Sequence, residues 1–184
     1  MKGKTIPFDT KKYGADITMQ MVKEAVFGIL AFRLVGTRVL DLFSCSGQIA
    51  IEALSRGADS AVLNERDRKR SEHLRRMISD FGLEKRTTLL NLPWEKALSR
   101  CAELGLSFDV IYCDPPYEKR AGEVTLYGDI LRTVDSAGLL ADGGIVVMQY
   151  HYGNVLEETA GGLVRTDERK YGQTGISIYG RMEP

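Results

Sequence analysis

The chain has 184 residues, 43% of them hydrophobic and 27% charged, a composition that fits one globular domain and excludes a disordered chain. Lys plus Arg and Asp plus Glu both number 25, so the formal net charge is zero and does not by itself indicate a nucleic-acid partner. The sequence contains neither an apolar run long enough to cross a bilayer nor a recognisable signal peptide, so we expect a cytoplasmic protein.

Residues 1–17 are expected to form a basic arm before a domain of residues 18–184. Lysines outnumber acidic residues in this arm, and glycine and proline interrupt any regular pattern. A solvated tail and an arm that binds a polyanion are both consistent with this composition. Thr18 is a suitable N-cap, and the apolar spacing that follows it predicts a helix over residues 19–30.

The next segment predicts a strand over residues 37–43, a turn of small residues over 44–47, and a helix over 48–57. Asp41 lies near the end of this strand, where packing gives no reason for a carboxylate. A turn of small residues before a helix lets a ligand approach the backbone and face the positive end of the helix. Structural turns between strands and helices also favour serine and glycine, so the turn alone does not show whether a ligand binds there.

A second strand over residues 60–65 precedes a helix over 67–81, and Glu65 ends this strand 24 residues after Asp41. An acidic residue at about this distance from such a turn commonly binds ribose hydroxyls, although an exposed charge is the alternative. Gly47 is the only glycine in the turn, so the pattern that binds a pyrophosphate is incomplete. These features favour a nucleoside cofactor without a pyrophosphate.

Basic residues are frequent around the start of the helix predicted over residues 67–81. They form either a solvated helix face, which is the more common case, or a surface for nucleic acid. They are Arg66, Arg68, Lys69, Arg70, Arg75 and Arg76.

A third strand is expected over residues 87–92, with Pro93 and Trp94 opening the next helix. Trp94 either covers the core or lies beside the flat ring of a ligand. The fourth strand, 108–113, leads into Asp114-Pro115-Pro116-Tyr117. The prolines hold Asp114 and Pro115 extended, so a carboxylate and a carbonyl lie at the end of the strand. In isolation this tetrapeptide would be interpreted as a turn.

The rest of the chain predicts a helix over residues 123–137, a strand over 145–150, and an antiparallel hairpin of strands 163–170 and 176–179. The fold class is therefore α/β, a doubly wound and mostly parallel sheet of seven strands with an antiparallel C-terminal hairpin. Ligands bind at the carboxyl ends of strands in such sheets. We therefore expect the 44–47 turn, Glu65 and the tetrapeptide to share one crevice.

Cysteine and histidine are too sparse to indicate a metal centre or a disulfide framework. Cys45, Cys101 and Cys113 are odd in number and widely spaced, and the only histidines are His73 and His151.

Two motifs resemble those of a known enzyme class. Residues 39–47, Val-Leu-Asp-Leu-Phe-Ser-Cys-Ser-Gly, resemble the first motif of S-adenosylmethionine-dependent methyltransferases, and the tetrapeptide at 114–117 resembles the signature of those that methylate exocyclic or amide nitrogens. Together with residues 22–30, 52–58 and 170–174, they make the chain similar to the bacterial 16S rRNA guanine-N2 methyltransferase family (RsmD type). The similarity runs from about Val22 to Tyr179 and implies a Rossmann-like methyltransferase fold.

This resemblance also implies roles for individual residues. The target amine would donate to the Asp114 side chain and the Pro115 carbonyl, and Tyr117 would stack on the target base. The implied partner is 16S rRNA or the assembling small ribosomal subunit, bound by a monomer without a metal. The implied contacts of S-adenosyl-L-methionine are Asp41, Phe43, Ser44, Cys45, Ser46, Gly47, Glu65, Arg66, Pro93 and Trp94.

The sequence departs from the family in three places. Glycine is usual where Cys45 stands, and basic strands with an Arg-Pro-Thr segment are usual where residues 14–18 precede the first helix. The residue that usually binds the adenine amine is replaced by Leu92, Pro93 and Trp94, so backbone atoms and packing would hold the adenine.

Other functions remain open from the sequence. The same chemistry serves methylation of DNA adenine or cytosine, or of a protein glutamine amide, although amide methyltransferases usually have Asn in place of Asp114. A non-catalytic RNA-binding or assembly protein on the same fold is a further alternative. A nicotinamide oxidoreductase is less favoured because the dinucleotide pattern is incomplete.

Overall fold

The computed structural model describes residue 9, residues 20–116 and residues 125–182. It divides into two compact units, unit one of residues 1–97 and unit two of residues 98–184. The predicted basic arm, apart from Asp9, lies outside the described residues, and so do Thr18 and Tyr117.

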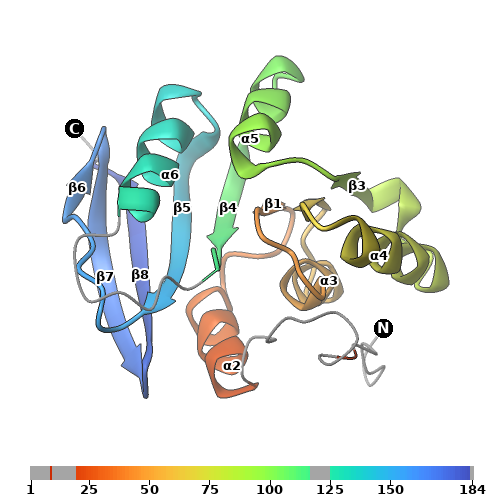
Figure 1. Ribbon diagram of the computed structural model, residues 1–184, viewed down its shortest axis with the longest axis horizontal. Coiled ribbons are helices and arrows are strands. Elements are labelled where there is room, and N and C mark those ends of the chain that lie inside the picture. The colour runs from red at the N-terminus through yellow and green to blue at the C-terminus, as the bar shows by residue number, and fades with distance from the viewer. Residues whose placement is uncertain (1–8, 10–19, 117–124, 183–184) are drawn as a thin grey trace. The chain divides into compact units, whose positions relative to one another are not determined.

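Unit one contains three parallel strands, which pair in the order β3-β2-β1. Figure 1 shows α3 and α4 on the same face of these strands. Each predicted element of this unit is present, with ends within a few residues of those expected. The elements are α2 (Gln20–Ile29), β1 (Arg38–Asp41), α3 (Gln48–Ser55), β2 (Ser60–Asn64), α4 (Arg68–Asp80), the 3-10 turn η1 (Glu84–Arg86) and β3 (Thr87–Leu90).

Helix α4 shows how the sequence determines these elements. Asp67 is its N-cap, and the Asp67 carboxylate accepts a hydrogen bond from the backbone N–H of Arg70 at 2.9 Å. Leu74, Met77 and Ile78 are spaced to lie on one face and are buried. The cap and the apolar stripe therefore fix where α4 begins and which face it turns to the sheet.

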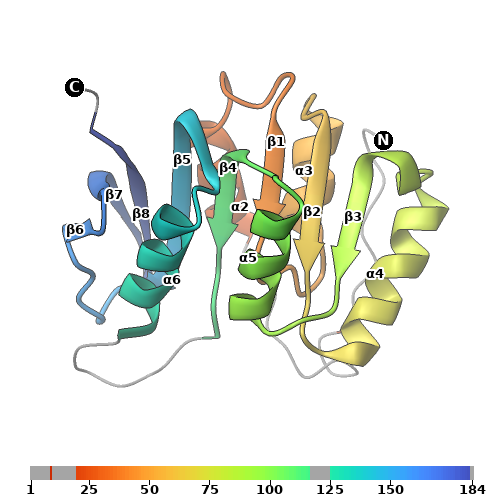
Figure 2. The ribbon, with the colours of Figure 1, turned by 90° about the horizontal axis from the view of Figure 1, so that it is seen from above.

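Unit two contains one parallel strand pair and an antiparallel extension, in the order β4-β5-β8-β7-β6. Helix α6 runs along β5 (Figure 2). The boundary between the units falls within α5. The elements are α5 (Trp94–Glu103), β4 (Phe108–Cys113), α6 (Thr125–Ser136), β5 (Leu140–His151), β6 (Thr159–Ala160), β7 (Leu163–Tyr171) and β8 (Thr174–Arg181).

The expected C-terminal hairpin is confirmed as β7 and β8, but its turn is shorter than the five residues predicted. Tyr171 pairs directly with Thr174, which leaves Gly172 and Gln173 as the connection. The seven expected strands are joined by an eighth, β6. It has only two residues, too few to leave an alternating pattern in the sequence.

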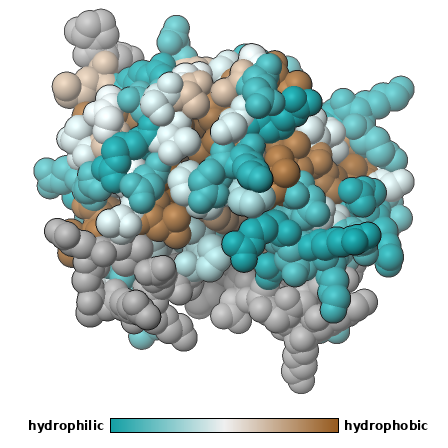
Figure 3. All heavy atoms as spheres, turned by 45° about the horizontal axis from the view of Figure 1, so that its top comes forward, coloured by the Kyte–Doolittle hydropathy of each residue, from teal (hydrophilic) through white to brown (hydrophobic). Residues whose placement is uncertain are grey.

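Exposed apolar side chains are scattered over both units, and on the face in Figure 3 the projecting side chains are mainly hydrophilic. Among the described helices, none has the length and apolar character needed to cross a membrane. In the part of the chain that the structure describes, the large exposed apolar residues are Met21, Phe32, Val35, Leu104, Tyr152, Val155 and Met182.

Candidate active site

The turn between β1 and α3 is closed by its own hydrogen bonds. The Ser44 hydroxyl donates to the carbonyl of Asp41 at 2.8 Å, and the Gly47 N–H donates to the carbonyl of Ser44 at 2.6 Å. Cys45 and Gly47 have φ values of 45° and 72°. A Cβ at Gly47 would lie 2.7 Å from a methyl group of Leu74, so α4 packs directly against the turn. Glycine at 47 is thus required both by its conformation and by this close approach.

Glu65 lies directly against this turn. One carboxylate oxygen accepts the N–H of Cys45 at 3.0 Å, and the other accepts the N–H of Asp67 at 2.7 Å. Arg70 pairs with the second oxygen at 3.2 Å. The side chain is 7% exposed. The expected proximity of the 44–47 turn and Glu65 is therefore present within unit one.

Two asparagines that the sequence did not single out connect the strand ends. The buried Asn64 amide donates to the carbonyls of Leu42 and Leu92, both at 3.1 Å, and accepts the Leu92 N–H at 3.3 Å. Asn91 donates to the carbonyls of Glu65 and Arg66. Asparagine is a common turn residue, so an asparagine at the end of a strand did not indicate this role in the sequence.

The other predicted cofactor residues also belong to unit one, at or just after the carboxyl ends of its strands. Asp41 is 1% exposed at the end of β1, and Ser46 is buried in the turn. Phe43 and Trp94 are half-buried, whereas Arg66 and Pro93 are exposed. This edge combines a carboxylate, an N-terminal helix end and two partly exposed aromatic rings, which suits a nucleoside ligand.

In unit two, Asp114 follows β4 and is held by a residue of the neighbouring strand. The Gln149 amide donates to Oδ2 of Asp114 at 3.0 Å, and the Tyr112 hydroxyl donates to Oε1 of Gln149 at 2.6 Å. Gln149 and Tyr112 are 3% and 1% exposed. Asp114 is half-buried, and Pro115 is buried. A buried side chain thereby holds one oxygen of the Asp114 carboxylate.

Gln149 was missed by the sequence reasoning, although a signal was present. It is the one polar side chain in the apolar run of residues 145–150. A buried amide needs hydrogen-bond partners, and Tyr112 and Asp114 supply them.

Cys101 and Cys113 are buried, and Cys45 is half-buried. No disulfide joins the three cysteines, and burial raises the pKa of Cys101 to about 11, so this thiol remains protonated at neutral pH. No group of three metal-ligating side chains occurs in the part of the chain that the structure describes.

Known proteins resemble the chain along most of its length. The family described as "Conserved hypothetical protein 95" matches residues 1–180. The chain is 33% identical over 162 residues to the Bacillus subtilis protein named "Putative rRNA methyltransferase YlbH", covering 88% of this chain and 85% of that protein. It is 27% identical over 180 residues to "Ribosomal RNA small subunit methyltransferase D" of Escherichia coli K12, covering 98% and 86% of the two chains.

A solved structure extends the likeness to the fold. The chain matches "Putative methyltransferase yhhF from Escherichia coli" with a TM-score of 0.79 and 25% identity, over 92% of this chain and 90% of that chain. The Rossmann-like α/β fold expected from the sequence is confirmed.

Proposed function

Because the chain belongs to the family described as conserved hypothetical protein 95 and its relatives are named rRNA methyltransferases, we propose that it is an S-adenosyl-L-methionine-dependent enzyme that methylates the exocyclic N2 of a guanine in small-subunit rRNA. The relatives' names support rRNA as the substrate. The Asp114 carboxylate at the end of β4, which accepts a hydrogen bond from Gln149, is the observation that supports an exocyclic amine as the target.

The residues of unit one fit the cofactor. Glu65 uses one oxygen for each of two backbone N–H groups, and a carboxylate has further lone pairs for ribose hydroxyls. Asp41 and the 44–47 turn would hold the methionine part. Among residues 92–94, Leu92 already donates its backbone N–H to Asn64, and Pro93 has no N–H. The backbone N–H of Trp94 is therefore the one that would donate to the adenine. The cofactor supplies an electrophilic methyl group on a positively charged sulfur.

The tetrapeptide would then orient the target amine. An exocyclic amine is conjugated with its ring, so its lone pair must turn out of the ring plane before it attacks a methyl group. The Asp114 carboxylate and the Pro115 carbonyl accept its two N–H groups and set that direction. A paired guanine hides its amine, so the base must be unpaired or extruded, and Tyr117 would receive it by stacking.

Nucleoside analysis tests this function. Mass spectrometry of 16S rRNA from strains with and without the gene should show one N2-methylguanosine that disappears with the gene. Purified protein and labelled cofactor should restore it on RNA or subunits from the deletion strain. If the deletion strain instead lacks N6-methyladenine or N4-methylcytosine in its DNA, the substrate is another base. If the purified protein transfers no methyl group to RNA, subunits or DNA, a non-catalytic protein is favoured.

The Asp114→Ala variant tests the tetrapeptide. Loss of a positioned group of this kind lowers kcat by about 100-fold or more. Affinity for the cofactor, measured by calorimetry, should remain within about twofold because Asp114 contacts the target amine instead. Asp142→Ala is the matched control, since Asp142 is exposed in the same unit. An equal loss of cofactor affinity in Asp114→Ala would contradict the assigned role.

A further inference from the structure

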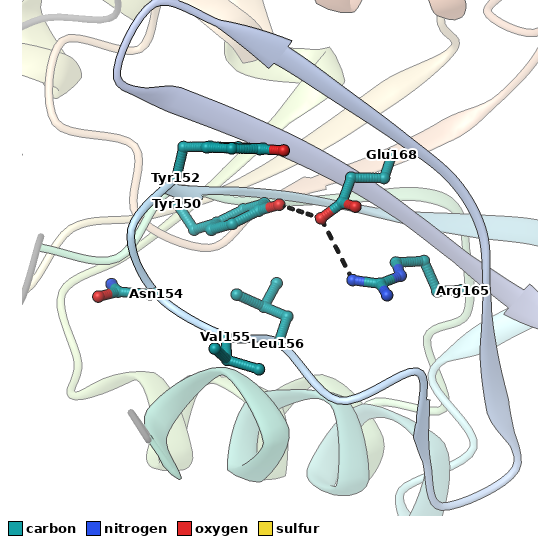
Figure 4. A pocket seen from close by; sticks show the side chains of 7 residues that line it. All are labelled: Tyr150, Tyr152, Asn154, Val155, Leu156, Arg165 and Glu168. Carbon is teal, nitrogen blue, oxygen red and sulfur yellow. Dashed lines mark hydrogen bonds and ion pairs between the residues drawn. The ribbon is translucent and has the colours of Figure 1, made fainter. Parts of the chain in front are cut away.

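A pocket outside the proposed chemistry lies at the C-terminal end of β5, the strand that also carries Gln149. Gln149 donates a hydrogen bond to Asp114, and the next residue in the chain is Tyr150. Tyr152 comes two residues after Tyr150. These tyrosines form one wall of a pocket of about 270 Å³ in unit two (Figure 4). The pocket therefore lies where the strand that positions Asp114 leaves the sheet.

The aromatic wall is rigid at its base. Tyr150 faces Gly175 across the β5–β8 pair, and a Cβ at Gly175 would overlap the Tyr150 ring. The Tyr150 hydroxyl donates to Glu168. Burial, together with this hydrogen bond, raises the pKa of Tyr150, so the hydroxyl remains a donor at neutral pH. These contacts leave the Tyr150 ring in one position.

Tyr152 extends this wall to the surface. Its ring stacks with that of Tyr150, with centroids 6.4 Å apart and planes inclined by 27°. It is 39% exposed, and the Lys170 ammonium lies 4.1 Å from its centroid. An accessible aromatic ring beside a lysine is the combination with which proteins bind unpaired nucleic acid.

The remaining walls are aliphatic and charged. Val155 and Leu156 line one side, and Val155 is 73% exposed. At the end of the pocket, Arg165 pairs with Glu168 at 3.2 Å (Figure 4). A flat ring with both donors and acceptors on its edge matches this arrangement, because the guanidinium donates and the carboxylate accepts.

We propose that this pocket binds an unpaired nucleobase of the RNA substrate, close in sequence to the target base. The proposal rests on the proposed function, since it assigns a second contact to the same RNA. The base stacks on Tyr152, its edge meets Arg165 and Glu168, and Lys170 moves from the ring to a neighbouring phosphate. The pocket then fixes which nucleotide reaches Asp114.

The test measures the affinity for 16S rRNA transcribed in vitro, which carries no methyl groups, over a series of salt concentrations. Tyr152→Ala should raise Kd between about fivefold and 100-fold, as expected for loss of one stacked base. The slope of log Kd against log salt should stay unchanged, because stacking releases no counterions. Tyr152→Phe should retain most of the affinity. Phe32→Ala, which removes a fully exposed ring from unit one, is the matched control.

The outcomes separate this proposal from the proposed function. If the wild type transfers methyl groups but Tyr152→Ala binds RNA normally, the pocket does not bind a base. An effect confined to the salt slope would also overturn it. Weaker methylation of assembled subunits with unchanged RNA affinity would assign the surface to a protein contact instead. If RNA binding depends on Tyr152 but no methyl transfer occurs, the pocket stands and the proposed function fails.

Discussion

Cys45 is the one non-glycine residue with a positive φ in the part of the chain that the structure describes, at 45°. This conformation explains why glycine suits the position, because a Cβ costs about 1–2 kcal/mol there. Its backbone N–H also contacts Glu65, so the turn cannot relax without disturbing that carboxylate.

We therefore predict that Cys45→Gly is more stable than Cys45→Ala. Removing the Cβ relieves about 1–2 kcal/mol of backbone strain in the folded protein. Glycine also makes the unfolded chain more flexible, which costs about 0.4–1 kcal/mol, so the free energy of unfolding should rise by about 0.5–1 kcal/mol. Urea denaturation of both variants measures the free energy of unfolding. The comparison uses alanine because it removes the thiol but keeps the Cβ. A less stable glycine variant would show that the turn is not strained.

Gln149 offers a second prediction at this scale. Gln149→Leu removes the hydrogen bond to Asp114, and we expect kcat to fall about 10-fold to 100-fold, as for one hydrogen bond to a charged group. Cofactor affinity should not change. Methyl transfer under saturating cofactor and RNA measures kcat, and calorimetry measures the affinity.

Gln149→Glu separates positioning from a purely structural role. It places a second carboxylate against Asp114, and two adjacent carboxylates raise the pKa of one of them. The pair is then fully charged only above the raised pKa, so activity should fall as the pH drops through it, at a higher pH than in the wild type. An unshifted pH profile would contradict the positioning of Asp114 by Gln149.

At the scale of elements, the apolar patterns were sufficient to predict type and order. The periodicities of β4 and α4 gave these elements nearly to the residue because a buried face forces a regular spacing. The site was predicted less completely. Glu65 and Asp114 could be proposed as site residues because charge and proline mark the ends of their strands. Gln149 left a signal, as a polar side chain in an apolar run, but its partner could not be identified. The partners of Gln149 and Asn64 lie on other strands, and only the register brings them together.

The β5–β8 pair provides a prediction about packing. Gly175→Ala places a methyl group against the hydroxyl-bearing edge of the Tyr150 ring, and overpacking of this kind lowers the free energy of unfolding by about 1–3 kcal/mol. Tyr150→Ala should remove most of this penalty, so a double-mutant cycle would give a coupling of similar size. Gly28→Ala is the control with the opposite sign, because that helical position has open space and alanine stabilises a helix by about 0.5–1 kcal/mol. Additive effects at Gly175 and Tyr150 would contradict the contact.

For the whole molecule, the two units carry residues with different proposed roles. The predicted cofactor residues lie in unit one, whereas Asp114 and the nucleobase pocket lie in unit two. Helix α5 belongs to both, because the boundary falls inside it. Unfolding of either unit would therefore break a helix of the other, and we expect one cooperative transition.

Cofactor binding should stabilise this single transition. A ligand at 100 times its Kd adds about 2.7 kcal/mol, which corresponds to a rise in Tm of about 5–10 °C for a chain of this size. Glu65→Gln should reduce that rise, because the amide loses the charge and one acceptor that the ribose hydroxyls require. The amide also weakens the turn without ligand, so the quantity to compare by calorimetry is the shift caused by cofactor in each variant. Two transitions, of which cofactor moves only one, would show that α5 does not couple the units. An undiminished shift in Glu65→Gln would remove this residue from the cofactor site.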